Sequence, residues 1–231
     1  MKTLYLKGLA YAAALCFAAT LSSCSLDGEY EQFIPQTELA VIQYTPDSSS
    51  WYVLNDFGLK LWPKNASAVE DKLQNNTRVL VVFNVLLDEK VSGYDYVVSL
   101  VYVAHINVYD ATPADSATLY APSDSLRNVE VAWIGSRYLN VDYYYSYSAD
   151  SAKHTERLLC DTAALQRGGS VKLLFRHNSN GDKGIKYRQS IVSFDLESLR
   201  SVVPADSISI AFEAECSSST YRKDLTYKFK N

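Results

Sequence analysis

The sequence predicts an all-β protein of two domains, and three features of the 231-residue chain support this prediction. Short runs rich in Val, Ile, Tyr and Phe recur from residue 38 onward, as in buried or half-buried strands. Clusters of Gly, Pro, Asn, Asp and Ser separate these runs, as turns do. No segment after residue 24 places apolar residues at helical spacing over a useful length.

The first domain is expected over residues 38–110. Residues 77–87 are apolar and β-branched on both faces, which indicates a strand buried on both sides. Residues 94–109 form a longer run of the same kind, which we expect to bend or to split into two strands. Gly58 can adopt a positive φ and close a hairpin. The predicted strands of this domain are 38–45, 51–55, 59–62, 77–87 and 94–109.

Residues 111–127 change in character, with two prolines, many small polar residues and little apolar mass. We interpret this segment as an interdomain linker. Strand patterns resume over residues 128–231, separated by Gly- and Ser-rich turns, and predict an antiparallel β-sandwich. The seven predicted strands are 129–134, 138–147, 156–161, 171–176, 187–194, 207–214 and 221–229.

The N-terminus has the pattern of an export signal, predicted over residues 1–23. Lys2 and Lys7 precede an uncharged apolar run over residues 8–21. This run is shorter than the roughly 20 residues that cross a bilayer, so cleavage is expected. The ending Leu21-Ser22-Ser23-Cys24 resembles the bacterial lipobox, in which the Cys is acylated and the chain is cut before it. The alternative is an ordinary signal peptide cut near residue 19 or 23.

Acylation of Cys24 would anchor the protein to a membrane, because several acyl chains together give stable attachment. Residues 24–37 are polar and are expected to form a tether. The expected location is therefore the cell envelope, at the outer membrane, on its surface or its periplasmic face.

The charge balance argues against nucleic acid as a partner. The formal net charge is −4, and cleavage of residues 1–23 removes two lysines and no acid, which leaves −6. Binding to phosphate backbones requires an excess of cations. We therefore expect no nucleic-acid partner.

Cys160 and Cys216 are the two cysteines that remain beyond the signal and Cys24. An oxidising envelope compartment favours a disulfide between an even pair, and two separately buried thiols are the alternative. A catalytic thiol is disfavoured, since neither residue has a recognisable histidine signature nearby.

The histidines do not form a recognisable catalytic or metal motif. His105 is expected within a strand, and His154 is expected in a solvated turn. His177 precedes Asn178, Asn180 and Asp182, whose oxygens could bind Ca²⁺. The carboxylate density of a calcium loop is missing, so we favour a strand that ends in a structural turn. No catalytic residue, metal or cofactor is predicted, and the protein is not expected to be an enzyme.

Nearly all of the chain after the signal resembles the NigD-like lipoproteins. The resemblance implies an N-terminal five-stranded OB-fold barrel, a C-terminal β-sandwich and a source among the Bacteroidota. The family takes its name from a gene near a bacteriocin, and its biochemical role is not established. The matching segments are 51–54, 58–63, 77–86 and 93–96 in the first half, and 133–135, 138–141, 175–178, 192–196 and 225–229 in the second.

Five Asp-(Ser/Thr)-aliphatic triplets resemble the O-glycosylation sequon that those bacteria use on exported proteins. The alternative is that these Asp-Ser pairs mark turns. The acceptor residues would be Ser116, Ser125, Ser151, Thr162 and Ser207.

The leading functional hypothesis is a non-enzymatic accessory module that binds another macromolecule of the envelope. OB-folds also bind oligosaccharides, and aromatic side chains can stack on sugars, so glycan or peptide capture through the barrel face is one alternative. A bacteriocin-immunity or envelope-protection factor is the other, suggested by the family name alone. The aromatic candidates for stacking are Trp51, Trp62, Tyr143, Tyr144 and Tyr145.

Overall fold

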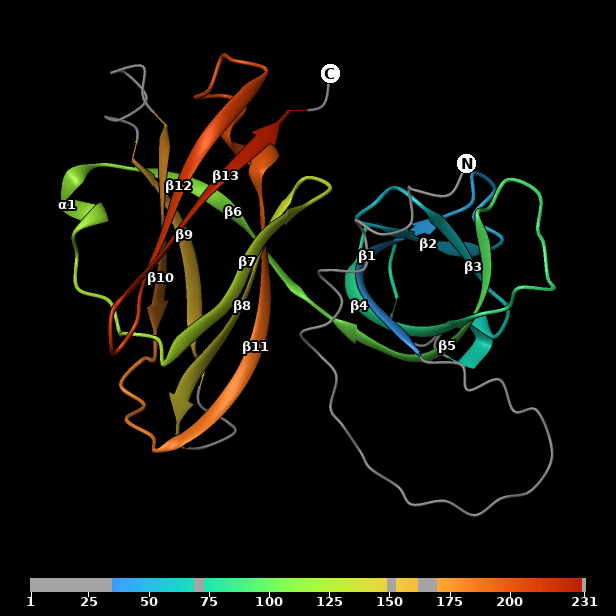
Figure 1. Ribbon diagram of the computed structural model, residues 1–231, viewed down its shortest axis with the longest axis horizontal. Helices are drawn as coiled ribbons and strands as arrows, with labels where there is room; N and C mark the ends of the chain where they lie inside the picture. The colour runs from blue at the N-terminus through green and yellow to red at the C-terminus, as the bar shows by residue number, and fades with distance from the viewer. Residues whose placement is uncertain (1–34, 69–72, 149–152, 162–169, 230–231) are drawn as a thin grey trace, which may run out of the picture.

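Two β-domains lie side by side in the computed structural model of the protein (Figure 1). The structure describes residues 35–68, 73–148, 153–161 and 170–229, and every structural statement below concerns those residues. The predicted signal, Cys24 and most of the predicted tether lie outside them, as do Ser151 and Thr162. No helix in the described part of the chain is long and apolar enough to cross a membrane.

The first domain is a closed barrel with the strand order β1-β2-β3-β5-β4. Its elements are β1 (Gln36–Tyr44), β2 (Trp51–Asn55), β3 (Lys60–Pro63), the 3-10 helix η2 (Ala66–Ala68), β4 (Arg78–Val85) and β5 (Tyr96–His105). Gly58 closes the turn between β2 and β3 with a φ of 83°, as predicted.

Alternation along each strand builds the barrel core. Val79, Val81 and Phe83 of β4 point inward and are at most 1% exposed, whereas Leu80 and Val82 between them are half-buried. The prediction that 77–87 is buried on both faces is therefore wrong, because a closed barrel buries fully only its inner face. The inward residues that make the core are Ala40, Ile42, Trp51, Val53, Leu61, Val79, Val81, Phe83, Val98 and Leu100.

The predicted split of residues 94–109 is confirmed. β5 ends at His105, and after the buried Ile106 the chain continues as β6 (Asn107–Ala114). β6 belongs to the second domain, so the predicted linker over 111–127 is wrong. Its first half pairs with β11 and its second half with β9, both in parallel. These ladders satisfy the backbone of a segment that offers little apolar surface of its own.

The second domain folds eight strands in the order β13-β12-β10-β9-β6-β11-β8-β7 into a sandwich. After the short helix α1 (Ser116–Leu119) come β7 (Asn128–Gly135), β8 (Tyr138–Tyr147), β9 (Thr155–Asp161), β10 (Val171–Asn178), β11 (Lys186–Asp195), the 3-10 helix η4 (Leu196–Leu199), β12 (Ser207–Glu215) and β13 (Thr220–Lys228). All seven strands predicted for this domain are present.

The sandwich is mixed and not purely antiparallel as predicted. β10 pairs with β12 in parallel, as β6 does with both of its neighbours. One layer holds β7, β8 and β11, the other holds β9, β10, β12 and β13, and β6 passes from the first layer to the second. Inward residues of both layers form one core, which includes Val141, Tyr143, Leu158, Leu173, Phe175, Phe194 and Phe212.

Candidate functional site

Aromatic side chains gather on the outer face of β2 and β3. Tyr52 and Trp62 occupy outward positions there, because the residues beside them point into the barrel core. The ring of Tyr94 lies between them, with its centroid 4.7 Å from that of Trp62 and 5.4 Å from that of Tyr52. The ammonium of Lys60 lies 5.9 Å from the Tyr52 centroid. We call these four residues the aromatic face.

A pocket of about 470 Å³ adjoins the aromatic face and shares Trp62 with it. Trp51 and Trp62 contribute indole rings, and the loop between β1 and β2 contributes three consecutive serines. The pocket therefore combines flat apolar surfaces with hydroxyl groups that can donate and accept hydrogen bonds. Its lining consists of Tyr44, Ser48, Ser49, Ser50, Trp51, Trp62, Pro63 and Ala66.

Asp47 holds the serine loop in shape. Its carboxylate accepts hydrogen bonds from Thr45 Oγ1 at 2.6 Å and from the backbone N–H and hydroxyl of Ser49 at 3.2 and 2.7 Å. These bonds stabilise the ionised form and lower the pKa of Asp47 to about 2. Ser48 takes a φ of 54° at the tip of the same loop. Asp47, the acid of the loop that lines the pocket, is therefore a structural anion.

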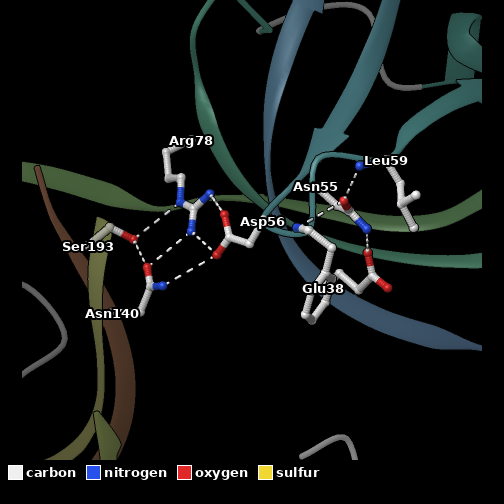
Figure 2. A network of polar contacts seen from close by, with 8 residues as sticks. Glu38, Asn55, Asp56, Leu59, Arg78, Asn140 and Ser193 are labelled. Atoms are coloured by element: carbon white, nitrogen blue, oxygen red, sulfur yellow. Dashed lines mark hydrogen bonds and ion pairs between the residues drawn. The ribbon is translucent and has the colours of Figure 1, made fainter. Parts of the chain in front are cut away.

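Figure 2 shows a buried polar network that joins the barrel to the sandwich. Arg78, at the start of β4, is 2% exposed and donates two hydrogen bonds to Asp56, at 2.5 and 2.7 Å. The same guanidinium reaches Asn140 Oδ1 on β8 at 3.1 Å and Ser193 Oγ on β11 at 3.3 Å. Ser193 in turn donates to Asn140 at 2.7 Å. We call Arg78, Asp56, Asn140 and Ser193 the interdomain network.

Further contacts close the interface around the network. The guanidinium of Arg78 lies over the ring of Tyr138, 4.4 Å from its centroid. Asp56 packs against the backbone of Gly135, where a Cβ atom would meet its Oδ2 at 2.0 Å. Asp56 belongs to the turn between β2 and β3, so the interface also fixes the hairpin that carries the aromatic face.

A second polar cluster lies at one end of the sandwich. Nδ1 of His154 lies 3.0 Å from Nε2 of His177, and Nε2 of His154 lies 3.2 Å from Asp182 Oδ2. Both the His154 and Asp182 side chains are at most 5% exposed, so the prediction that His154 is solvated is wrong. His177 is 3% exposed, and its Nδ1 has no hydrogen-bond partner. Burial lowers the pKa of His177 to about 4.

Hydrogen bonds within the protein already occupy side-chain oxygens that the calcium site considered for this turn would require. Asn178 accepts the N–H of Asn180, and Asp182 accepts the N–H of Ser148 and faces His154. The structural interpretation of the turn after β10 therefore fits the geometry. No group of three His, Cys, Asp or Glu side chains within the described ranges is arranged to hold a metal ion. His105 lies in β5, as expected, with its side chain exposed.

The structure keeps the two predicted disulfide partners apart as free cysteines, Cys160 buried in β9 and Cys216 just after β12. Cys160 pairs with Leu173, which pairs with Phe212, four residues before Cys216. Strand spacing and rise then put the two Cα atoms roughly 16 Å apart. A disulfide requires less than about 7 Å, so the two-thiol alternative describes this structure.

Of the predicted glycosylation residues, Ser151 and Thr162 lie outside the described residues, and the other three belong to separate segments of the second domain. Ser125 is exposed beside the bridge that Asp124 makes with His177. Ser207 is exposed at the start of β12, and Ser116 begins α1.

Of the aromatic stacking candidates, Trp62 is partly exposed and lines the pocket, and its role in stacking stays a prediction. Trp51 also lines the pocket but is 4% exposed, while Tyr143 is fully buried in the sandwich core. Sequence reasoning missed Tyr52 and Tyr94, although the alternation of β2 identifies Tyr52 as an outward residue. It also missed the interdomain network, whose members come from four separate segments.

Two family models match the chain. The NigD-like N-terminal OB domain matches residues 40–106, and the NigD-like C-terminal beta sandwich domain matches residues 112–227. These ranges coincide with the barrel and the sandwich. A search of the curated proteins finds no match.

Solved structures with the same fold come from Parabacteroides and Bacteroides species. A toxin-related protein from Parabacteroides distasonis ATCC 8503 aligns with a TM-score of 0.66 and 22% identity, over 84% of this chain and 94% of that one. A NigD-like immunity protein from Bacteroides caccae ATCC 43185 aligns with a TM-score of 0.62 and 18% identity, over 84% and 97%. A protein from Bacteroides fragilis NCTC 9343, described as a lipoprotein, aligns with a TM-score of 0.59 and 12% identity, over 86% and 99%.

At these identities the likeness to solved structures establishes the fold, and the family models establish membership. The chain belongs to the NigD-like family, with an OB domain followed by a β-sandwich domain.

Proposed function

We propose that this protein is a non-enzymatic binding module of the cell envelope, held by acylated Cys24, which captures carbohydrate through the aromatic face of its barrel. The observation that carries the proposal is the pocket between Trp51, Trp62 and the serines of the β1–β2 loop. OB-folds bind oligosaccharides on this part of the barrel, which involves strands 2 and 3 and the first loop.

The chemistry of the pocket suits a sugar ring. The apolar C–H face of a pyranose can stack on the half-buried indole of Trp62, while its hydroxyls bond to the serines. Asp47 braces the loop before a ligand arrives, which reduces the entropy lost on binding. The interdomain network fixes the β2–β3 turn in the same way.

The charge of the site disfavours nucleic acid. Single strands require a basic groove with stacking aromatics. Within the described lining of the pocket and the aromatic face, Lys60 is the one cation, and the whole chain carries a formal charge of −4. The site therefore has the aromatic side chains that single-strand binding requires, but its described lining lacks the basic groove.

Hydrolysis of a bound sugar is also disfavoured by the residues at the pocket. A glycosidase needs a carboxylic acid with a raised pKa, close to a second carboxylate. The hydrogen bonds to Asp47 lower its pKa to about 2, so it stays ionised and cannot act as a general acid near neutral pH. Capture without turnover therefore fits these residues best.

The anchor rests on the lipobox resemblance at Cys24 and on the Bacteroides fragilis neighbour, which is described as a lipoprotein. Fractionation of cells that express Cys24→Ser tests it. The variant is expected to leave the membrane fraction. Unchanged partitioning into membranes would contradict acylation at this residue.

A glycan array probed with the chain from Ser25 onward tests the capture function. Trp62→Ala should weaken the bound signal at least about tenfold, the loss expected of a central aromatic contact. Tyr102→Ala is the matched control, because this aromatic residue is 57% exposed on β5 of the same barrel. A clean array together with a co-purified envelope protein would instead support the binding of a protein partner.

Immunity against a bacteriocin is a second candidate. It is favoured by the structural likeness to the Bacteroides caccae protein described as a NigD-like immunity protein. Deletion of the gene should then sensitise cells to a bacteriocin encoded nearby. Equal survival of the deletion strain would remove this candidate.

A further inference from the structure

The turn between β10 and β11 carries an exposed basic and apolar tip. Ile185 is 89% exposed and Tyr187 is 55% exposed, although both are large apolar side chains. Lys183, Lys186 and Arg188 stand beside them and are also exposed. We call these five residues the basic tip. No acidic residue interrupts the segment from 183 to 189.

Arg127 extends the positive charge of the tip, because its guanidinium lies 4.6 Å from the centroid of Tyr187. Within the tip, the guanidinium of Arg188 lies 4.4 Å from the centroid of Tyr147. The nearest acid in the turn, Asp182, faces inward to Ser148 and His154 with 5% of its side chain exposed. The tip is therefore a local excess of positive charge on a chain whose formal charge is −4.

The turn that presents the tip is tightly braced. Asp182 accepts the N–H of Ser148, and Asn180 donates its amide to the backbone carbonyl of Lys153 at 2.5 Å. Gly184 lies so close to Tyr147 that a Cβ atom would sit 1.6 Å from its carbonyl carbon. These contacts turn the backbone of the segment inward and leave Ile185 pointing outward.

An apolar side chain at the point of a convex turn, flanked by cations, matches the chemistry of an anionic membrane surface. Apolar groups enter the headgroup boundary while Lys and Arg bind anionic headgroups. The negative charge of the rest of the molecule does not prevent this, since charges act over about 8 Å at physiological salt. Figure 1 places the start of β11 at the end of the sandwich opposite the C-terminal end of β13, where the tip can meet a flat surface.

We propose that the basic tip docks the sandwich onto the anionic headgroups of a lipid bilayer, with Ile185 entering the interface. The contact would orient the protein on the membrane. It does not depend on sugar capture by the barrel or on acylation at Cys24, so a result that disproves either of those proposals does not contradict this one.

Sedimentation with vesicles tests the proposal, using the chain from Ser25 onward without acyl groups. The two cores consist entirely of residues after 39, so this chain retains both. It should bind vesicles that contain phosphatidylglycerol, should bind phosphatidylcholine vesicles much less, and should dissociate as salt is added.

Two double variants that each remove two positive charges distinguish binding through the tip from general electrostatic attraction to the vesicle. Lys183→Gln with Lys186→Gln should weaken binding about twenty-fivefold, from about fivefold for each cation at an anionic surface. Lys90→Gln with Lys228→Gln is the matched control, because both residues are exposed and lie outside the tip. This control should change binding less than about twofold.

Ile185→Ser distinguishes a bilayer from a soluble anion. It should weaken vesicle binding about fivefold or more through lost apolar burial, with the fold unchanged by circular dichroism. Equal losses in the tip and control variants would overturn the proposal. The proposal would also be overturned if Ile185→Ser bound vesicles as strongly as the unchanged protein and the protein bound dextran sulfate equally strongly. Dextran sulfate is a soluble anionic polymer, so binding to it does not require insertion of an apolar side chain.

Discussion

The carboxylate of Asp56, in the barrel, rests directly on the backbone of Gly135, in the sandwich, with no room between them for a methyl group. Oδ2 of Asp56 also accepts a hydrogen bond from Arg78 at 2.7 Å and lies 3.4 Å from Asn140 Nδ2. Asp56 therefore cannot move aside without breaking the contacts that hold the two domains together.

Gly135→Ala should destabilise the protein for this reason. The new Cβ would lie 2.0 Å from Oδ2, and overpacking of this kind costs about 1–3 kcal/mol. Urea unfolding of the two proteins measures the difference. In an Asp56→Ala background the same substitution should cost less, because Oδ2 and Cγ are gone and only the Cβ of residue 56 remains, 2.9 Å from the new methyl group. An undiminished cost in that background would place the strain elsewhere.

Removal of one partner from the buried Arg78–Asp56 ion pair should lower the free energy of unfolding more than Gly135→Ala does. Arg78→Met leaves Asp56 as an uncompensated buried anion, and such changes cost about 3–5 kcal/mol. Replacement of both residues, Arg78→Met with Asp56→Leu, should recover much of that loss. Denaturant melts of the single and double variants measure both effects.

The exposed pair Lys64–Glu89 supplies the comparison for this prediction. Its lysine side chain is 60% exposed, so Lys64→Met should cost less than about 1 kcal/mol. If Lys64→Met and Arg78→Met lower the free energy of unfolding equally, burial of the Arg78–Asp56 pair does not make the loss of one partner more costly.

The strands could be predicted from the sequence because each carries its own pattern. The strand predicted over Trp51–Asn55 has the bounds of β2, since alternation and the flanking turn residues suffice there. The continuation of β6 beyond Tyr109 could not be predicted, because its pairing comes from β9 and β11, which lie about 50 and 80 residues further along the chain. Its exposed side chains and Pro113 resemble those of a loop.

The polar sites were beyond sequence reasoning for a related reason. Arg78 looks like the first residue of a strand, where a surface charge is ordinary, and nothing local shows that Asn140 and Ser193 face it. His154 and His177 are 23 residues apart and meet only because their strands end side by side. Trp62 was identified as an aromatic candidate, but its pocket depends on the β1–β2 loop.

The stability of the sandwich should fall as the pH drops from about 6.5 to about 4. His177 has its pKa lowered to about 4 by burial, whereas an unfolded chain holds it near 6.5. The unfolded state therefore binds the proton first, and stability is lost across this window as pH decreases. The shift corresponds to up to about 3 kcal/mol once both states are protonated.

His177→Gln isolates this effect, because glutamine keeps a donor for His154 and does not titrate. The free energies of unfolding of the two proteins should converge between pH 7 and pH 4. Parallel curves would show that His177 does not carry the acid sensitivity in this pH range.

The two cysteines should behave as separate thiols of unequal reactivity. Burial raises the pKa of Cys160 to about 11, and its side chain is fully buried within β9. Cys216 is only partly buried, and burial also raises its pKa. Because the thiolate is the reactive form, both should react slowly, Cys216 first.

Thiol titration of the chain from Ser25 onward measures this directly, since that chain lacks Cys16 and Cys24. Two thiols should be counted after denaturation without reductant, and alkylation of the native protein should label Cys216 before Cys160. Reductant should leave the midpoint of thermal unfolding unchanged. A count of zero thiols would mean that the two residues are bridged, which would require β9 and the end of β12 to approach far more closely than their shared register with β10 allows.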